Sequence, residues 1–401
     1  MPGNLRDRLK RIQHLEKEKT AVRGTNNAGG SGISFFTEQG WVPAGHLTLR
    51  YEVTSGEDMA LPATMPEAAA IVMPGITGAT AYEDLLFFDL ETSGLSGGAG
   101  TLAFLAAFGR LIPAGSANSK TARYKIHITQ YLLLDYPGES NFVEMLLGEF
   151  NDNSTIVSYN GKSFDSQILK TRCLMNGMIP PEYRHADLLH SARRLWKTIL
   201  PDCSQGTIET AILGIDRTGD IPGAMAPEIW FSFLRNGDGN AAAALLKIAE
   251  HNRRDITGLA AILRAMTRIA ADPLAAMKTI NFDLESLALR RHALNNKTGH
   301  RLLKYAAEAG HPRAGLSYAH ALFKAGNCDE GREWLLKTVS AGQPPSQTAA
   351  FRALAIDSEH RLKNAAEALS FTEQGLKLLA SDSPRREEFE RRLQRLKCRL
   401  K

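Results

Sequence analysis

The pattern of apolar and polar positions between residues 85 and 134 predicts three consecutive strands. The apolar runs are "LLFFDLE", "TLAFLAAFGRL" and "KIHITQYLLL". The Gly-rich segment "TSGLSGGAG" separates the first two runs and is typical of a flexible hairpin turn. Short connections between strands favour antiparallel neighbours, so this part of the chain is expected to form an antiparallel meander.

Helical and strand patterns then alternate. "SNFVEMLLGEF" predicts a helix, "STIVSYN" a strand, and "SFDSQILKTRCLMNG" a second helix that Gly177 closes. A meander followed by this alternation predicts an α/β fold, with a mixed sheet flanked by helices. A ribonuclease-H-like fold is built in this way, as are other mixed folds.

The segments on either side of this region have different patterns. Residues 4–22 predict a charged helix, 25–32 a linker, and 33–80 a small β extension that includes the strand "GHLTLRYEV". From 186 the chain is mainly helical, with an interruption at "ADPL" near 272. We therefore expect three domains, at 1–80, 81–272 and 273–401.

The last of these regions is expected to be entirely helical. A weak internal repeat with an offset of 37 residues pairs Glu330 with Glu367 and Trp334 with Phe371. Helix pairs of this length resemble tetratricopeptide-type repeats of about 34 residues. Such repeats would offer a docking surface for a protein partner rather than chemistry.

Composition narrows the class of protein. The 401 residues are 43% hydrophobic and 23% charged, with a net charge of +5 that is compatible with an anionic partner. The four cysteines are scattered and form no CxxC pair, so neither a zinc knuckle nor a disulfide framework is predicted. No run of 18 apolar residues occurs, and we expect a cytoplasmic protein with no membrane segment.

Two acids end the first predicted strand. Asp89 and Glu91 flank Leu90, and the two-residue period of a strand sends both acids to the same face. Like charges at one site repel each other, and burial strengthens that repulsion unless a cation or a shared proton relieves it. The pair therefore indicates either a metal site or a solvent-exposed strand end.

Two further acids lie in contexts that suggest a shared site. Asp165 begins a predicted helix directly after a strand, with Asn160 and Phe164 just before it. His251 and Asp255 are four residues apart and so share one face of a periodic helix. Leu259 and Ile262 continue the same side of that helix, so Asp255 is expected to face the core or a cleft and to need a partner.

The ordered motifs Asp-x-Glu, Asn-x-x-x-Phe-Asp and His-x-x-x-Asp resemble those of the DEDD superfamily of 3′–5′ exonucleases. Within it, residues 85–265 are similar to the YprB-type ribonuclease-H-like proteins. The segments that carry this resemblance are "LLFFDLETSGLSGGAGTLAFL", "LLHSARRLWK", "CSQGTIETAILG", "DRTGDIPG" and "HNRRDI".

The resemblance implies a metal-dependent nuclease. Four carboxylates, matched here by Asp89, Glu91, Asp165 and Asp255, would hold two Mg²⁺ or Mn²⁺ ions and cleave single-stranded RNA or DNA by a two-metal mechanism. His251 would be the general base. A histidine in this role usually precedes the last Asp by five residues, and the four-residue spacing here is that of the branch that uses tyrosine.

The same resemblance implies substrate contacts, in which Thr92, Gly94 and Leu95 would line the pocket for the terminal nucleotide, and Asn160 and Phe164 would steady the substrate strand. Other residues have two interpretations. Arg193 and Arg194 are either phosphate contacts or a solvated helix face, and Asp187 is either a fifth ligand or a helix or turn cap. The competing function is a non-catalytic nucleic-acid-binding or adaptor protein that uses the helical repeats.

Overall fold

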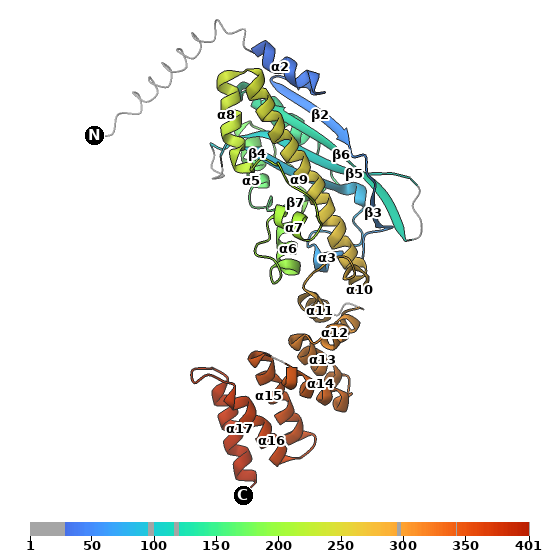
Figure 1. Cartoon of the computed structure of the whole chain (residues 1–401), viewed down its shortest axis with the longest axis vertical. Helices are drawn as coiled ribbons and strands as arrows, with labels where there is room; N and C mark the ends of the chain where they lie inside the picture. The colour runs from blue at the N-terminus through green and yellow to red at the C-terminus, as the bar shows by residue number, and fades with distance from the viewer. Residues whose placement is uncertain (1–28, 95–99, 116–119, 295–297, 342, 401) are drawn as a thin grey trace, which may run out of the picture. The chain divides into compact units, whose positions relative to one another are not determined.

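The computed structural model describes residues 29–94, 100–115, 120–294, 298–341 and 343–400. These residues form two compact units. The first unit contains the described residues up to Met65, together with Ala79–Leu188 and Glu209–Arg264. The second contains Pro66–Gly78, Leu189–Ile208 and the described residues from Ala265 onward. Figure 1 colours the chain by residue number, so the segments of each unit can be located in it.

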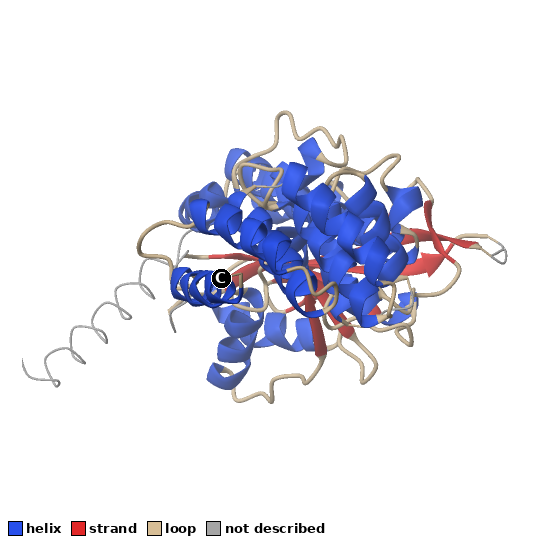
Figure 2. Cartoon of the chain, turned by 90° about the horizontal axis from the view of Figure 1, so that it is seen from below, coloured by secondary structure: helices blue, strands red, loops and turns tan. Residues whose placement is uncertain are grey.

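One mixed sheet forms the centre of the first unit, and its strands (red) lie together in Figure 2. Its order is β1-β2-β6-β5-β4-β7-β8, and β3 also pairs with β6. The strands are β1 Val42–Gly45, β2 Thr48–Thr54, β3 Met59–Pro62, β4 Leu85–Thr92, β5 Ala103–Pro113, β6 Thr121–Leu133, β7 Thr155–Ser158 and β8 Arg184–Asp187. The predicted meander is confirmed, because β4, β5 and β6 pair antiparallel in sequence order. Strands β7 and β8 then add parallel to β4, which confirms the predicted mixed sheet.

The predicted β extension is part of this same sheet. Strand β2, which the "GHLTLRYEV" pattern predicted, pairs antiparallel with β6 from Thr48 to Thr54. Strand β3 pairs with the opposite end of β6. The long β6 therefore holds the N-terminal strands against the meander.

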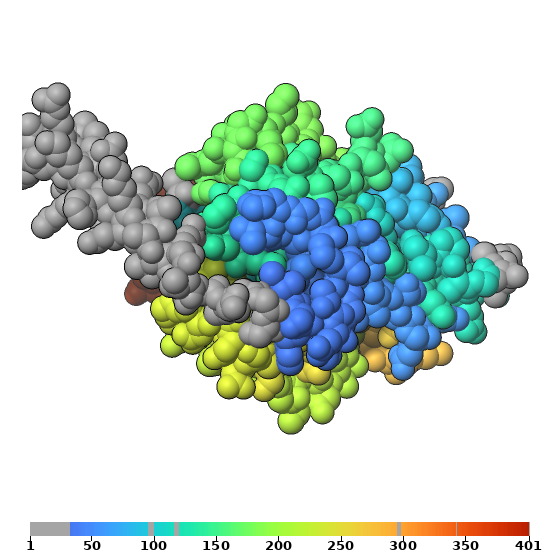
Figure 3. Space-filling view, turned by 90° about the horizontal axis from the view of Figure 1, so that it is seen from above, coloured from blue at the N-terminus to red at the C-terminus, as the bar shows by residue number. Residues whose placement is uncertain are grey.

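Helix α2, Gly29–Glu38, corrects part of the sequence prediction. It begins inside the segment 25–32 that was expected to be a linker. Phe36 on this helix is fully buried, and its ring packs edge-on against Trp41 and Phe233. This burial offsets the low helix propensity of the glycines. Figure 3 shows the blue N-terminal segment on the surface beside the yellow residues of α8 and α9. The predicted helix over 4–22 lies outside the described residues.

Strand β8 was not predicted either. The sequence pattern from 186 onward favoured helix, yet Arg184–Asp187 pairs parallel with β7. Four residues are too few to show a two-residue period, so only tertiary pairing defines this strand. Asp187 consequently lies at the end of an edge strand.

Before Leu284, the described residues also form 3-10 turns at Tyr82–Asp84, Tyr136–Gly138 and Gly223–Met225, and helices α3 Ala69–Val72, α4 Glu139–Leu147, α5 Asp165–Met175, α6 Leu188–Trp196, α7 Gln205–Ala211, α8 Ala226–Asn236, α9 Gly239–Ala271 and α10 Pro273–Ala276. Gly177 has φ = +71° after α5, as its predicted closing role requires. Helix α9 ends where "ADPL" predicted an interruption, and Asp272 caps α10.

A glycine on β5 sets how closely α9 approaches the sheet. A Cβ atom at Gly109 would lie 2.5 Å from Cγ2 of Ile256. Any larger residue would push the helix away from β5. Helix α9 therefore lies directly over the centre of the sheet, which brings its polar residues close to β4 and β6.

The C-terminal region from Leu284 is helical, as predicted. It contains α11 Leu284–Ala293, α12 Gly299–Glu308, α13 Pro312–Lys324, α14 Cys328–Ala341, α15 Pro344–His360, α16 Ala365–Lys377 and α17 Arg386–Arg399. Each of these helices packs against the next along the chain. The segments related by the internal repeat are α14 and α16, which begin 37 residues apart. Their assignment to the tetratricopeptide type stays a prediction. Among the helices of the described ranges, none has the length and apolarity needed to cross a membrane.

A buried acid connects the helices of this region. The side chain of Asp357 on α15 is 3% exposed, and it accepts hydrogen bonds from Arg332 at 2.8 Å and from Arg361 at 2.5 Å. Burial raises the pKa of Asp357, but the hydrogen bonds from Arg361 and Arg332 outweigh it and leave the pKa below its ordinary value. Because the folded state lowers this pKa, the ionised carboxylate stabilises the fold above the unfolded pKa. That stabilisation is lost as the pH falls through the folded pKa.

We expect Asp357→Asn to destabilise this helical region at pH 7 by about 2 kcal/mol, the usual scale for hydrogen bonds to a charged group. Hydrogen exchange of peptides from α14–α16 measures the loss, and the difference from the wild type in urea denaturation should shrink as the pH falls toward about 3. The exposed Asp382→Asn is the matched control. Equal protection in the two variants would contradict the expectation.

Candidate functional site

Asp89 and Glu91 end the central strand β4. β5 flanks this strand on one side and β7 on the other. Both acids point to the same face, and Glu91 is only 9% exposed. The carboxyl ends of the parallel strands β4 and β7 meet at this edge of the sheet, the usual place for a ligand site in α/β folds. The solvent-exposed strand end that the sequence allowed for Glu91 is therefore excluded.

Asp165 and Asp255 join this pair from two helices. Asp165 is the first residue of α5, directly after the turn that follows β7. That turn packs tightly, since a Cβ atom at Gly161 would lie 2.7 Å from Oδ2 of Asp165. Asp255 comes from α9. Burial raises the pKa of Asp89 well above its usual value, and repulsion from Asp255, Asp165 and Glu91 raises it further. The structure thus brings all four carboxyl groups into one site.

Burial and neighbouring charges also disfavour the ionised forms of Glu91 and Asp165. Burial, followed by the charges of Asp255 and Asp165, raises the pKa of Glu91 well above its usual value. Burial and the charge of Asp187 raise the pKa of Asp165 to about 7. Each of these groups would be stabilised in its charged form by a cation placed among them.

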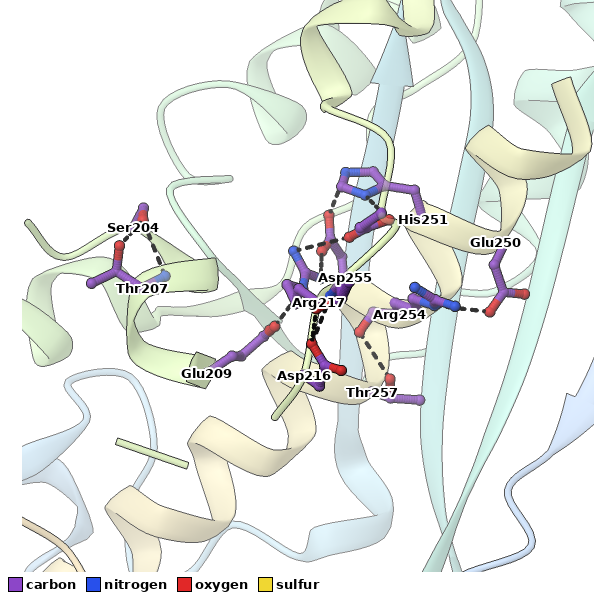
Figure 4. Close-up of polar contacts among 12 residues, drawn as sticks. Ser204, Thr207, Glu209, Asp216, Arg217, Glu250, His251, Arg254, Asp255 and Thr257 are labelled. Atoms are coloured by element: carbon purple, nitrogen blue, oxygen red, sulfur yellow. Dashed lines mark hydrogen bonds and ion pairs between the residues drawn. The ribbon is translucent and has the colours of Figure 1, made fainter. Parts of the chain in front are cut away.

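His251 lies between two carboxylates (Figure 4). Its Nε2 atom is 3.3 Å from Oδ2 of Asp255, one helical turn further along α9. Its Nδ1 atom is 2.9 Å from Oδ1 of Asp220. Asp220 belongs to the segment "DRTGDIPG", which contributed to the family resemblance but had no role assigned to it from the sequence. The ring of His251 therefore lies between the two carboxylates, within ion-pair distance of each.

Arg217, from the same segment, supplies positive charge to the acidic cluster. Its guanidinium group pairs with Asp255 and with Glu209, whose Oε2 is 2.7 Å from Nε, and it lies 3.6 Å from Asp220 (Figure 4). The side chain of Glu209 is 1% exposed, and Gly258 on α9 makes room for it, because a Cβ atom there would overlap the carboxylate. Sequence reasoning missed this group, because Glu209, Arg217 and Gly258 come from separate segments.

A chain of buried amides from α9 and β6 reaches Asp89. Asn252 on α9 is fully buried and donates a 2.7 Å hydrogen bond from Nδ2 to Oδ2 of Asp89. The Oδ1 atom of Asn252 accepts from Nε2 of Gln130 on β6 at 2.9 Å. The amide of Gln130 also donates to the carbonyl oxygen of Ala249 at 2.8 Å. Gln130 thereby sets which end of the Asn252 amide faces Asp89.

Asp187 caps the turn between β7 and α5. Its Oδ1 accepts from the backbone N–H of Asn160 at 2.8 Å, and its Oδ2 accepts from that of Lys162 at 3.2 Å. Asn160 has φ = +64°, a left-handed conformation that asparagine tolerates better than most residues. Of the two interpretations of Asp187, the structure therefore shows the turn cap. The position of Asn160 is fixed through its backbone.

The other expected substrate contacts are scattered around this edge. The hydroxyl of Thr92 donates to the carbonyl oxygen of Gly94 at 2.9 Å, which ties down the start of the hairpin turn. Leu95 lies outside the described residues. Phe164 precedes α5 and is 46% exposed, so its ring is available to a ligand. Arg193 and Arg194 belong to the second unit.

The donor set fits a hard divalent cation, although the side chains do not surround one in this conformation. Carboxylate oxygens are the ligands that Mg²⁺ and Mn²⁺ prefer. Burial, followed by repulsion from the neighbouring carboxylates, raises the pKa values of Asp89 and Glu91. Across the described ranges, no three His, Cys, Asp or Glu side chains are close enough together to hold an ion. Asp255 is engaged by Arg217 and His251, so an ion there would have to replace the guanidinium.

Comparison with known proteins covers the same segment. Residues 86–267 match the sequence model of the RNase_H superfamily, and all four acids and His251 lie within this range. Over 188 residues the chain is 36% identical to the uncharacterized protein YprB of Bacillus subtilis (strain 168). This alignment covers 46% of this chain and 42% of YprB, which is less than half of that relative.

One solved structure shows only a weak likeness. The family B DNA polymerase from the hyperthermophilic archaeon Pyrobaculum calidifontis aligns over 53% of this chain and 29% of its own, with 17% identity and a TM-score of 0.30. That likeness is too low to bear on fold or function. Residues 86–267 are therefore similar to the RNase_H superfamily, the observed mixed sheet is consistent with that similarity, and the chain resembles YprB over part of its length.

Proposed function

We propose that this protein is a metal-dependent 3′–5′ exonuclease that hydrolyses phosphodiester bonds of single-stranded RNA or DNA. The observation that carries the proposal is the convergence of Asp89, Glu91, Asp165 and Asp255, from β4, α5 and α9, at the carboxyl edge of one sheet. The match of residues 86–267 to the RNase_H superfamily supports nuclease-type chemistry. The polarity and the preference for single strands rest on the resemblance to DEDD exonucleases.

These four acids would hold two Mg²⁺ or Mn²⁺ ions. When bound, such ions stabilise the attacking and leaving oxygens of an in-line phosphodiester cleavage. His251 would accept a proton from the attacking water, the general-base role that histidine most often fills in enzymes. The carboxylate of Asp220, 2.9 Å from Nδ1, would stabilise the positive charge that the ring then carries.

Other residues of the chain would prepare this site. Asn252 fixes the rotation of the Asp89 carboxylate, and Gln130 fixes Asn252. Arg217 offsets the negative charge around Asp255 when no ion is present, and Glu209 can retain the guanidinium when it leaves Asp255. The substrate strand would be contacted by Thr92, Gly94, Leu95, Asn160 and Phe164.

A second candidate function is a non-catalytic nucleic-acid-binding or adaptor protein. The observation that favours it is the series of helices α11–α17, each packed on the next, which is typical of docking surfaces. A protein of that kind has no need for four acids held together against their mutual repulsion. For this reason we place the nuclease first and treat the helical region as a candidate surface for a partner protein.

The first test is cleavage of 5′-labelled single-stranded RNA and DNA with Mn²⁺. We expect a ladder that shortens from the 3′ end, no product after chelation with EDTA, and a rate at least about 100-fold lower for Asp89→Asn, since that change removes a charged ligand. Asp152→Asn, on an exposed turn, is the matched control and should cleave like the wild type. Equal product from Asp89→Asn and the wild type would exclude the proposed site.

The second test concerns the buried amides. We expect Asn252→Ala to weaken Mn²⁺ binding, measured by calorimetry, by about 10- to 100-fold, the usual effect of losing a residue that orients a ligand. Gln130→Met should act in the same direction and add little to Asn252→Ala in the double variant, because Gln130 acts through Asn252. The exposed Asn236→Ala serves as control. Fully additive effects would contradict the hydrogen-bonded chain.

The third test removes one repelling charge. Since the folded state raises the pKa of Asp165 to about 7, folding binds a proton that the unfolded chain releases near pH 4. Stability of the metal-free protein therefore falls as the pH rises from about 4 to 7. In EDTA at pH 8, Asp165→Asn should raise the melting temperature by a few degrees, about 2–4 °C per kcal/mol for a unit of this size. The gain should vanish near pH 4, while Asp152→Asn should show none at either pH.

A further inference from the structure

A cavity of about 280 Å³ opens beside the candidate site in the first unit. It lies between α5 and the segment that leads into β8, and its lining includes Lys162, Lys170, Pro180, Pro181, Tyr183 and His185. This volume is close to the lower end of small-molecule pockets, about 300 Å³, and suits a ligand of the size of one nucleotide. No residue of this lining belongs to the set of acids and substrate contacts assigned above.

The rim of the cavity is positively charged. Lys162 and Lys170 are both exposed, and neither forms an ion pair with an acid in the part of the chain that the structure describes. The described residues that line the cavity include no Asp or Glu. Two lysines without an internal counter-charge favour an anionic ligand, such as the phosphates of a nucleic acid.

The opposite wall is apolar and rigid. The ring of Tyr183 stacks on Phe150, with centroids 5.3 Å apart and an interplanar angle of 21°. Pro180 and Pro181 continue this wall and have little conformational freedom to lose. Fixed aromatic and apolar faces next to a basic rim are the combination on which single-stranded nucleic acids stack their bases.

The floor is polar and neutral. His185 on β8 contacts the hydroxyl of Ser158 at 2.7 Å and that of Ser166 at 3.2 Å. Burial lowers the pKa of His185 to about 4, so the ring is uncharged at neutral pH. The positive charge of the cavity therefore comes from the two lysines at its rim.

The cavity is joined to the acidic cluster through one turn. The backbone N–H of Lys162 donates to Asp187, and its carbonyl oxygen accepts from the side chain of Gln167 on α5 at 3.2 Å. Asp165 follows Lys162 by three residues and begins that helix. The rim lysine and the acid are thus held by the same turn. A strand with one phosphate at the acids would reach this cavity within a few nucleotides.

We infer that this cavity is a second nucleotide subsite, in which Lys162 and Lys170 contact phosphates of a single-stranded polynucleotide and the wall formed by Pro180, Pro181 and Tyr183 stacks on a base. This inference rests on the proposed nuclease function and extends it from the reacting nucleotide to a neighbouring part of the strand.

Binding of labelled single-stranded oligonucleotides to full-length Asp89→Asn, in Mg²⁺ at several salt concentrations, tests the inference. Adding Lys162→Gln and Lys170→Gln should weaken binding about tenfold or more, similarly for different base sequences. The slope of log K against log salt should fall by about 1.4, or roughly 0.7 for each phosphate of a single strand that a lysine no longer neutralises. The matched control carries Lys304→Gln and Lys377→Gln, which remove the same charge from exposed positions on α12 and α16.

Three results would overturn the subsite. They are an unchanged affinity and salt slope in the cavity variant, an equally weakened affinity in the control, and competition by a free nucleoside monophosphate that is as strong as that by the strand. None of these three results contradicts the nuclease proposal if the protein with Asp89 intact still shortens the same oligonucleotides. Failure of that cleavage, together with no binding by Asp89→Asn, would remove both.

Discussion

Repulsion between buried carboxylates is the constraint on which the candidate site depends. Asp89, Glu91, Asp165 and Asp255 are brought together by a strand and two helices, and burial leaves little water to screen them. The surrounding structure must supply the energy that holds them there. The close contact between α9 and β5 and the tight turn before α5 do so, and Arg217 offsets part of the charge. Holding four acids together lowers the stability of the fold, and a non-catalytic protein would gain nothing in return.

The sequence was informative where local pattern and chemistry coincide. Alternation around Leu90 correctly placed Asp89 and Glu91 on one face, and the strand-to-helix transition correctly placed Asp165 at the start of α5. Helical spacing also put His251 beside Asp255. These predictions depend on periods of two or four residues, which a single segment is long enough to show. The order of the motifs along the chain also carried the resemblance to ribonuclease-H-like proteins, which the sequence match over residues 86–267 supports, whereas the DEDD exonuclease type stays a prediction.

The missed features all depend on contacts between distant segments. Asp220 and Arg217 lie in an irregular loop whose pattern gives no sign that it folds against α9. Gln130 is an isolated polar residue within an otherwise apolar strand, and only its partner on α9 explains it. Strand β8 is too short to reveal its type. Gln130 itself was the available signal for a contact with a distant segment, because a buried polar side chain in the middle of a strand requires a hydrogen-bonding partner.

The direction of the hydrogen bonds between Gln130, Asn252 and Asp89 has a consequence for reading related sequences. Alignment scores treat Asn and Asp as near equivalents, and the two side chains have almost the same shape. At position 252 their effects are opposite, because the amide donates a hydrogen bond to Asp89, whereas a carboxylate would place another negative charge beside it. Spontaneous deamidation of this one residue would therefore convert a support of the acid cluster into an additional source of repulsion. A homologue with aspartate there should be regarded as altered at this acidic cluster, even with all four acids intact.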